Sequence, residues 1–179
     1  SDIIETSIFQ KRWFHLVNKG YGLRHVPIMI SLSWNQEVFN KTLEVLLSRH
    51  NVLLTVFKDA DNAFLADRNF VMLNSIKIHD LTKENSSLPM PDFIQELSET
   101  RKISAPNIFE LPSWFIDVIV IDDNKFSILL LLQHIEFDGE SLEIFFREFD
   151  CIYSCLLNGL EINLPSTRSY SKINFVNST

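Results

Sequence analysis

The chain has 179 residues, 46% of them hydrophobic and 22% charged, with a formal net charge of -7, a balance typical of one globular domain. The negative charge gives no basic surface for nucleic acid, no apolar run approaches the ~20 residues of a membrane span, and residues 1–5 do not resemble a signal peptide. We therefore expect a cytoplasmic protein with no nucleic-acid or membrane partner.

A strand followed by a long helix is predicted first. Residues 26–31 favour a strand, and Ser33 with Gln36 three residues later is typical of a capping box that opens a helix. Apolar residues then recur at helical spacing, so this helix should end near Arg49.

The middle of the chain predicts short elements. Residues 51–57 should be extended, residues 59–62 have turn chemistry, and residues 64–78 can supply two short strands. A polar loop is expected over 82–91 and a helix over 92–102.

The second half predicts a hairpin and a long helix. Residues 114–121 and 126–133 are apolar strands joined by a turn at 122–125, and the second strand should be central in its sheet. After Gly139 an apolar stripe continues for five turns and should end at Gly159.

Helices interspersed with hairpin strands favour an α+β sandwich, in which helices cover a mostly antiparallel or mixed sheet. Residues 160–179 have little periodicity and read as a connector or tail. Cys151 and Cys155 lie four residues apart within the last helical pattern, which favours packing in the core over a metal site or a redox pair.

Residues 133–139 read Gln-His-Ile-Glu-Phe-Asp-Gly, directly between the second apolar strand and the last helix. His134 at a strand end can accept a proton from an attacking amine or hydroxyl. Asp138 can cap the following helix or orient the loop through an ion pair, and Gly139 permits close approach of a substrate arm. Taken alone, His134 also fits a hydrogen-bonded structural histidine.

With this motif the chain resembles the condensation domains of nonribosomal peptide synthetases, members of the chloramphenicol-acetyltransferase-like superfamily with the signature HHxxxDG. Segments similar to other family motifs follow one another in the family's order, so the resemblance extends along nearly the whole chain. These segments are residues 7–14, 49–57, 109–111 and 164–165, with Tyr170.

The resemblance implies a chloramphenicol-acetyltransferase-like sandwich that forms one lobe of a two-lobed domain. Residues 1–160 would be the N-terminal condensation lobe, and residues 161–179 a connector toward a second lobe that this chain does not contain. We expect the isolated chain to be inactive, either as a truncated lobe or because a partner chain supplies the second lobe. A trimer like those of the small acetyltransferases of the superfamily fits less well, since their motif lies near the C-terminus.

The implied reaction is amide-bond formation between acyl groups carried on the phosphopantetheine arms of peptidyl or acyl carrier proteins, in the biosynthesis of antibiotics or other secondary metabolites. His134 would be the catalytic residue, and Gln133, Asp138 and Gly139 would complete the motif. No metal and no bound cofactor is implied. The expected partners are carrier proteins, neighbouring synthetase domains and the second lobe.

Three positions depart from the family pattern. Gln133 replaces the first histidine of the signature, Leu54 replaces an arginine, and Ile116 stands where the arginine that pairs with the motif aspartate is expected. Two interpretations stay open: an acyltransferase lobe, or a degenerate lobe that serves as a scaffold or docking surface. Epimerisation and heterocyclisation are less favoured, and heterocyclising relatives have an aspartate at the position of Gln133.

Overall fold

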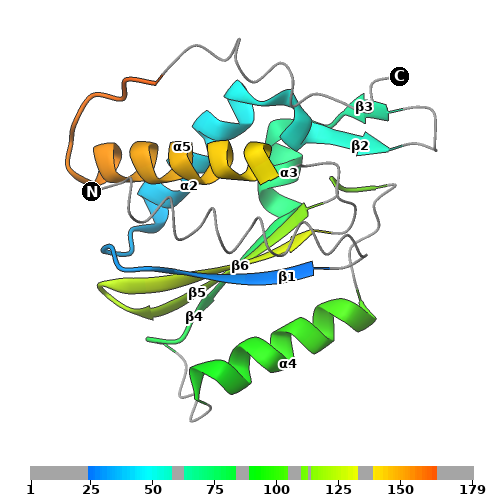
Figure 1. Cartoon of the computed structure of the whole chain (residues 1–179), viewed down its shortest axis with the longest axis vertical. Helices are drawn as coiled ribbons and strands as arrows, with labels where there is room; N and C mark the ends of the chain where they lie inside the picture. Colours follow the sequence, from blue (N-terminus) through cyan, green and yellow to red (C-terminus); the bar gives the residue numbers. More distant parts are fainter. Residues whose placement is uncertain are drawn as a thin grey trace.

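The computed structural model describes residues 24–57, 63–83, 89–104, 110–112, 114–132 and 139–164 (Figure 1). Within these ranges a mixed four-stranded sheet has the order β1-β6-β5-β4, with β6 antiparallel to both neighbours and β4 parallel to β5. The strands are β1 (Arg24–Ile30), β4 (Ile76–Asp80), β5 (Trp114–Asp122) and β6 (Lys125–Leu132).

Helices cover both faces of this sheet (Figure 1). The helices α2 (Gln36–Arg49) and α5 (Gly139–Leu157) lie side by side on one face, and α4 (Met90–Ile103) lies on the other. The expected α+β sandwich with a mixed sheet is confirmed. A short 3-10 helix, a two-stranded hairpin and a further helix follow α2: η1 (Asn51–Leu54), β2 (Thr55–Phe57), β3 (Ala63–Leu65) and α3 (Arg68–Asn74).

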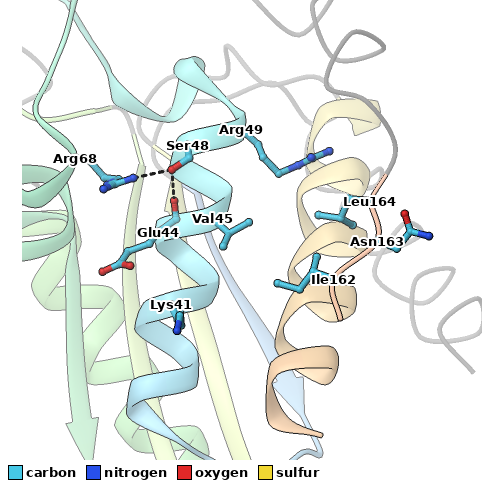
Figure 2. A pocket seen from close by; sticks show the side chains of 9 residues that line it. All are labelled: Lys41, Glu44, Val45, Ser48, Arg49, Arg68, Ile162, Asn163 and Leu164. Atoms are coloured by element: carbon cyan, nitrogen blue, oxygen red, sulfur yellow. Dashed lines mark hydrogen bonds between the residues drawn. The ribbon is translucent and has the colours of Figure 1, made fainter. Parts of the chain in front are cut away.

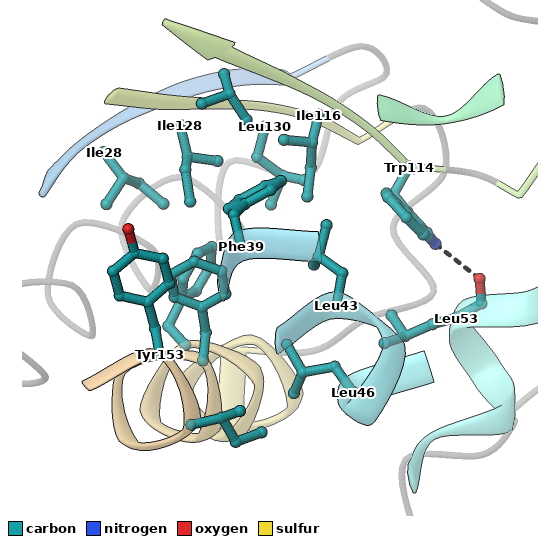
Figure 3. Close-up of a cluster of buried hydrophobic side chains, with 14 of the residues drawn as sticks. Ile28, Phe39, Leu43, Leu46, Leu53, Trp114, Ile116, Ile128, Leu130 and Tyr153 are labelled. Carbon is teal, nitrogen blue, oxygen red and sulfur yellow. Dashed lines mark hydrogen bonds between the residues drawn. The ribbon is translucent and has the colours of Figure 1, made fainter. Parts of the chain in front are cut away.

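The core between the sheet and the pair α2 and α5 is apolar and tightly packed (Figure 3). Ile116 of β5 and Ile128 of β6 point into it, because alternate residues of a strand face the same side. Phe39 of α2 and Tyr153 of α5 meet them from the helical layer. A fully buried side chain of this kind contributes about 1.5–3 kcal/mol through the hydrophobic effect.

The start of α2 corrects one prediction. Asn35, not Ser33, is the N-cap, since its side-chain oxygen accepts a hydrogen bond of 3.0 Å from the backbone N–H of Val38. The hydroxyl of Ser33 instead donates to Asn124 in the turn between β5 and β6. The predicted end of this helix at Arg49 is confirmed.

The region after α2 is more helical than predicted. Residues 51–54 form a 3-10 turn, so only residues 55–57 of the predicted extended segment are a strand. Two strands do occur within or near residues 64–78, but α3 lies between them and begins where Asp67 caps the backbone N–H of Phe70 at 3.2 Å. The predicted turn at 59–62 lies outside the described residues.

The later predictions agree better with the structure. The hairpin of β5 and β6 is confirmed, and β6 lies inside the sheet as expected. The last helix is also confirmed, and it is followed by Gly159 with a φ of 66°. Residues 160–164 form neither helix nor strand, and residues 165–179 of the predicted connector lie outside the described residues. In the described part of the chain no helix combines the length and hydrophobicity needed to cross a membrane.

Candidate functional site

The predicted motif joins an interior strand to the longest helix described. The strand β6 ends at Leu132, and Gly139 is the first residue of α5. Gln133, His134 and Asp138 lie outside the described residues, so their roles stay predictions. Leu132 and Gly139, on either side of residues 133–138, are described, and the elements to which they belong define the site's surroundings.

A buried charged cluster joins the end of α2 to α5. Glu148 of α5 is 2% exposed, and Arg49 donates to its two carboxylate oxygens from Nε at 2.8 Å and from Nη2 at 3.3 Å. The ring atom Nε2 of His50, the C-cap of α2, lies 2.9 Å from Oε1 of the same carboxylate. Removing a partner from such a buried pair is costly, so the cluster strongly constrains how α2 and α5 meet.

The end of α2 is also tied to the sheet. The backbone N–H of Leu53 donates to the carbonyl of His50 at 3.0 Å, which closes the 3-10 turn after α2. The indole Nε1 of Trp114 donates to the carbonyl of Leu53 at 2.9 Å (Figure 3). Trp114 is the first residue of β5 and pairs with Leu132, the last residue of β6. The turn after α2 therefore contacts the strand end at which the motif begins.

A second buried charged cluster lies on the opposite face of the sheet. Asp117 of β5 is 0% exposed, and Arg101 of α4 donates to both of its oxygens, at 2.9 and 2.7 Å. Nε2 of His79 in β4 lies 2.8 Å from Oδ1 of Asp117. Burial alone would raise the pKa of Asp117, but the hydrogen bonds from Arg101 and His79 outweigh it and hold this pKa below its ordinary value. This cluster attaches α4 to the sheet.

The two apolar residues predicted to replace family arginines, Ile116 and Leu54, lie in the core or pack against it. Ile116 is 1% exposed and faces α2 and α5. Leu54 is half-buried and packs against the same cluster. Asp117, the neighbour of Ile116, faces the other side of the sheet and has Arg101 as its partner. Asp138 itself lies outside the described residues.

A cavity of about 530 Å³ opens between α2 and residues 162–164 (Figure 2). Its apolar lining comes from Val45, Ile162 and Leu164. Its remaining lining residues are Lys41, Glu44, Ser48, Arg49, Arg68 and Asn163. Arg68 donates to the hydroxyl of Ser48 at 2.7 Å, so its guanidinium is held against α2. None of the described residues that line this cavity is a predicted site residue.

In the part of the chain that the structure describes, no three His, Cys, Asp or Glu residues are grouped so that they could hold a metal ion. Cys151 and Cys155 are both half-buried on α5.

Sequence reasoning missed Glu148 and Asp117. Each carried a signal, because Glu148 falls on the apolar stripe of its helix and Asp117 is a lone charge in an apolar strand. Such a charge on a buried face requires a partner.

The comparisons with known proteins agree on one family. The family model described as Condensation domain matches residues 1–174. The bassianolide nonribosomal cyclodepsipeptide synthetase of Beauveria bassiana is 26% identical over 164 residues, which cover 89% of this chain and 5% of the synthetase.

Two solved structures show the same fold. VibH, a condensation enzyme, aligns with a TM-score of 0.63 at 14% identity, covering 94% of this chain and 38% of VibH. The epimerization domain from the third module of tyrocidine synthetase B aligns with a TM-score of 0.58 at 21% identity, covering 89% of this chain and 36% of that domain. The chain thus spans less than two fifths of either structure, and the fold is shared by a condensation enzyme and an epimerization domain.

Proposed function

This chain belongs to the condensation-domain family, and we propose on that premise that it is the N-terminal lobe of a domain that forms amide bonds in nonribosomal peptide synthesis. The substrates would be two acyl or aminoacyl groups, each held as a thioester on the phosphopantetheine arm of a carrier protein. The observation that carries the proposal is the junction of β6 and α5, which brackets the family motif from Gln133 to Gly139.

The proposed reaction is an attack of the acceptor amine on the carbonyl carbon of the donor thioester. A C–N bond forms, the C–S bond breaks, and the donor arm leaves as a thiol after it takes up a proton. His134 either accepts the amine proton or positions the amine and stabilises the tetrahedral intermediate. Gly139 leaves room for the arm beside the first turn of α5.

The proposed partners follow from this reaction. A donor carrier protein and an acceptor carrier protein deliver the substrates, and a second lobe completes the site around His134. Neighbouring synthetase domains would hold these parts together. The chain itself would bind no metal or cofactor.

A scaffold lobe is the second candidate. Gln133 in place of the first motif histidine and Leu54 in place of an arginine favour it, because both remove ionisable groups from the family pattern. Leu54 packs against the core, so the fold accommodates the loss. In this alternative the lobe docks neighbouring domains and performs no acyl transfer.

The deciding experiment uses the complete condensation domain that carries this lobe. It is mixed with a donor carrier protein loaded with an acyl group and an acceptor carrier protein loaded with an amino acid, and the acceptor is analysed by mass spectrometry. Amide product on the acceptor arm supports the enzyme. If neither this domain nor its Gln133→His variant yields product while a condensation enzyme does so with the same carriers, the scaffold function replaces it.

A further inference from the structure

The two elements that flank the motif, β6 and α5, are connected by a continuous series of contacts outside the motif itself. Leu132 pairs with Trp114 across β6 and β5, and the indole of Trp114 donates to the carbonyl of Leu53 at 2.9 Å. The N–H of Leu53 donates in turn to the carbonyl of His50 at 3.0 Å. These contacts run from the strand end before the motif to the C-cap of α2.

The series ends on α5. Nε2 of His50 lies 2.9 Å from Oε1 of Glu148, and Arg49 donates to both oxygens of that carboxylate. Glu148 is nine residues after Gly139, a distance of about 13 Å along a helix at ~1.5 Å per residue. We call this series the contact path; it consists of Leu132, Trp114, Leu53, His50 and Glu148.

Charged hydrogen bonds constrain α5 in a way that its apolar face does not. Phe149 and Tyr153 of α5 bury their rings in the core and oppose separation of the helix from the sheet. Apolar contacts are non-directional, so they resist sliding or rotation about the helix axis less strongly. Arg49 donates to Glu148 from two nitrogens and His50 lies against one of the same oxygens, which fixes both the axial position and the rotation of the helix.

We propose that Glu148 is a positioning residue for the reaction at His134. It acts by fixing the start of α5 at Gly139, the last residue of the motif, relative to the end of β6. This inference rests on the proposed function. A helix is stiff over nine residues, so a shift at Glu148 reaches Gly139 nearly undiminished, and a misplacement of ~1 Å can cost about a hundredfold in rate.

The test is Glu148→Gln in the complete condensation domain, assayed for amide product with loaded carrier proteins. Glutamine preserves the size of the side chain but removes the charge that holds Arg49. We expect kcat to fall at least about tenfold, with KM for both carriers changed by less than about twofold, because positioning acts on the chemical step.

Val71→Ala is the matched control. Val71 is fully buried in α3, lies outside the contact path, and its truncation destabilises the fold without removing a charge. Both variants are assayed at a temperature where circular dichroism shows them fully folded. We expect Val71→Ala to retain the kcat of the unsubstituted domain.

The possible outcomes separate the two proposals. If kcat of Glu148→Gln stays within about threefold of the unsubstituted value, or falls no further than that of Val71→Ala, the positioning role is wrong. His134→Ala is measured in the same assay. If it leaves the rate unchanged, or neither the unsubstituted domain nor its Gln133→His variant makes product, the proposed function itself fails.

Discussion

Removing Arg101 tests whether the buried cluster at Asp117 holds α4 on the sheet. In Arg101→Met the carboxylate of Asp117, which is 0% exposed, keeps His79 as its one partner among the described residues. Methionine preserves an apolar stem beside Phe115. In the unsubstituted protein the guanidinium carbon of Arg101 lies 4.4 Å from the centroid of the Phe115 ring. The substitution therefore removes charge and hydrogen bonds more than it removes packing.

The expected cost follows from the burial of this pair. Removing one partner of a buried ion pair costs about 3–5 kcal/mol, and the lower end applies here because His79 still contacts Asp117. Loss of the cation over the ring of Phe115 adds about 0.5–1 kcal/mol. We expect the free energy of unfolding to fall by about 3.5–4 kcal/mol. The double variant Arg101→Met with Asp117→Leu should lose less, since no buried carboxylate remains.

Urea denaturation of the chain at pH 7, followed by circular dichroism, measures these free energies. A loss below about 1 kcal/mol for Arg101→Met would be that of an exposed ion pair and would refute the reasoning. If the double variant lost as much free energy of unfolding as Arg101→Met, or the sum of the two single losses, the unpaired carboxylate of Asp117 would not be the cause of the cost.

Two further predictions concern the rest of the fold. Because the pKa of Asp117 is lowered in the folded state, its contribution to stability is complete above the unfolded pKa of ~3.9 and is lost as the pH falls through the folded pKa. The unsubstituted chain should therefore lose more free energy of unfolding between pH 5 and pH 2 than the Asp117→Asn variant does, as measured by urea denaturation at each pH. An equal loss in the two proteins would contradict this. Leu43→Ala truncates a core side chain that is 1% exposed and should lower the free energy of unfolding by about 2–5 kcal/mol. Leu73→Ala, at an 80% exposed position, should change it by no more than about 0.5 kcal/mol. Urea denaturation measures both, and equal losses would contradict the assigned core.

Much of the sheet and its last helix could be predicted because their signals are local. The apolar runs of β5 and β6 flank a turn, and α5 carries an apolar stripe for its whole length. The helix α3 was missed because Phe70 to Leu73 is a short apolar run, and such a run fits a strand as well as a helix. Its N-cap Asp67 was the signal that could have separated the two.

The charged clusters could not be predicted because their partners are distant in sequence. Arg49 and Glu148 are 99 positions apart, and the sequence around either residue does not indicate that the other is its partner. The structure supplied that pairing, whereas the sequence supplied the motif itself. His134 was identified from its neighbours in the motif and from the order of the other family segments, which are features of sequence alone.

The central claim is that the motif between β6 and α5 forms amide bonds through His134. Its most direct test is the rate of amide formation by the complete condensation domain with His134→Ala, measured by mass spectrometry of the acceptor carrier arm. The account predicts a fall of at least about tenfold, in the range that a positioned acid–base or electrostatic group contributes. A rate equal to that of the unsubstituted domain would contradict it.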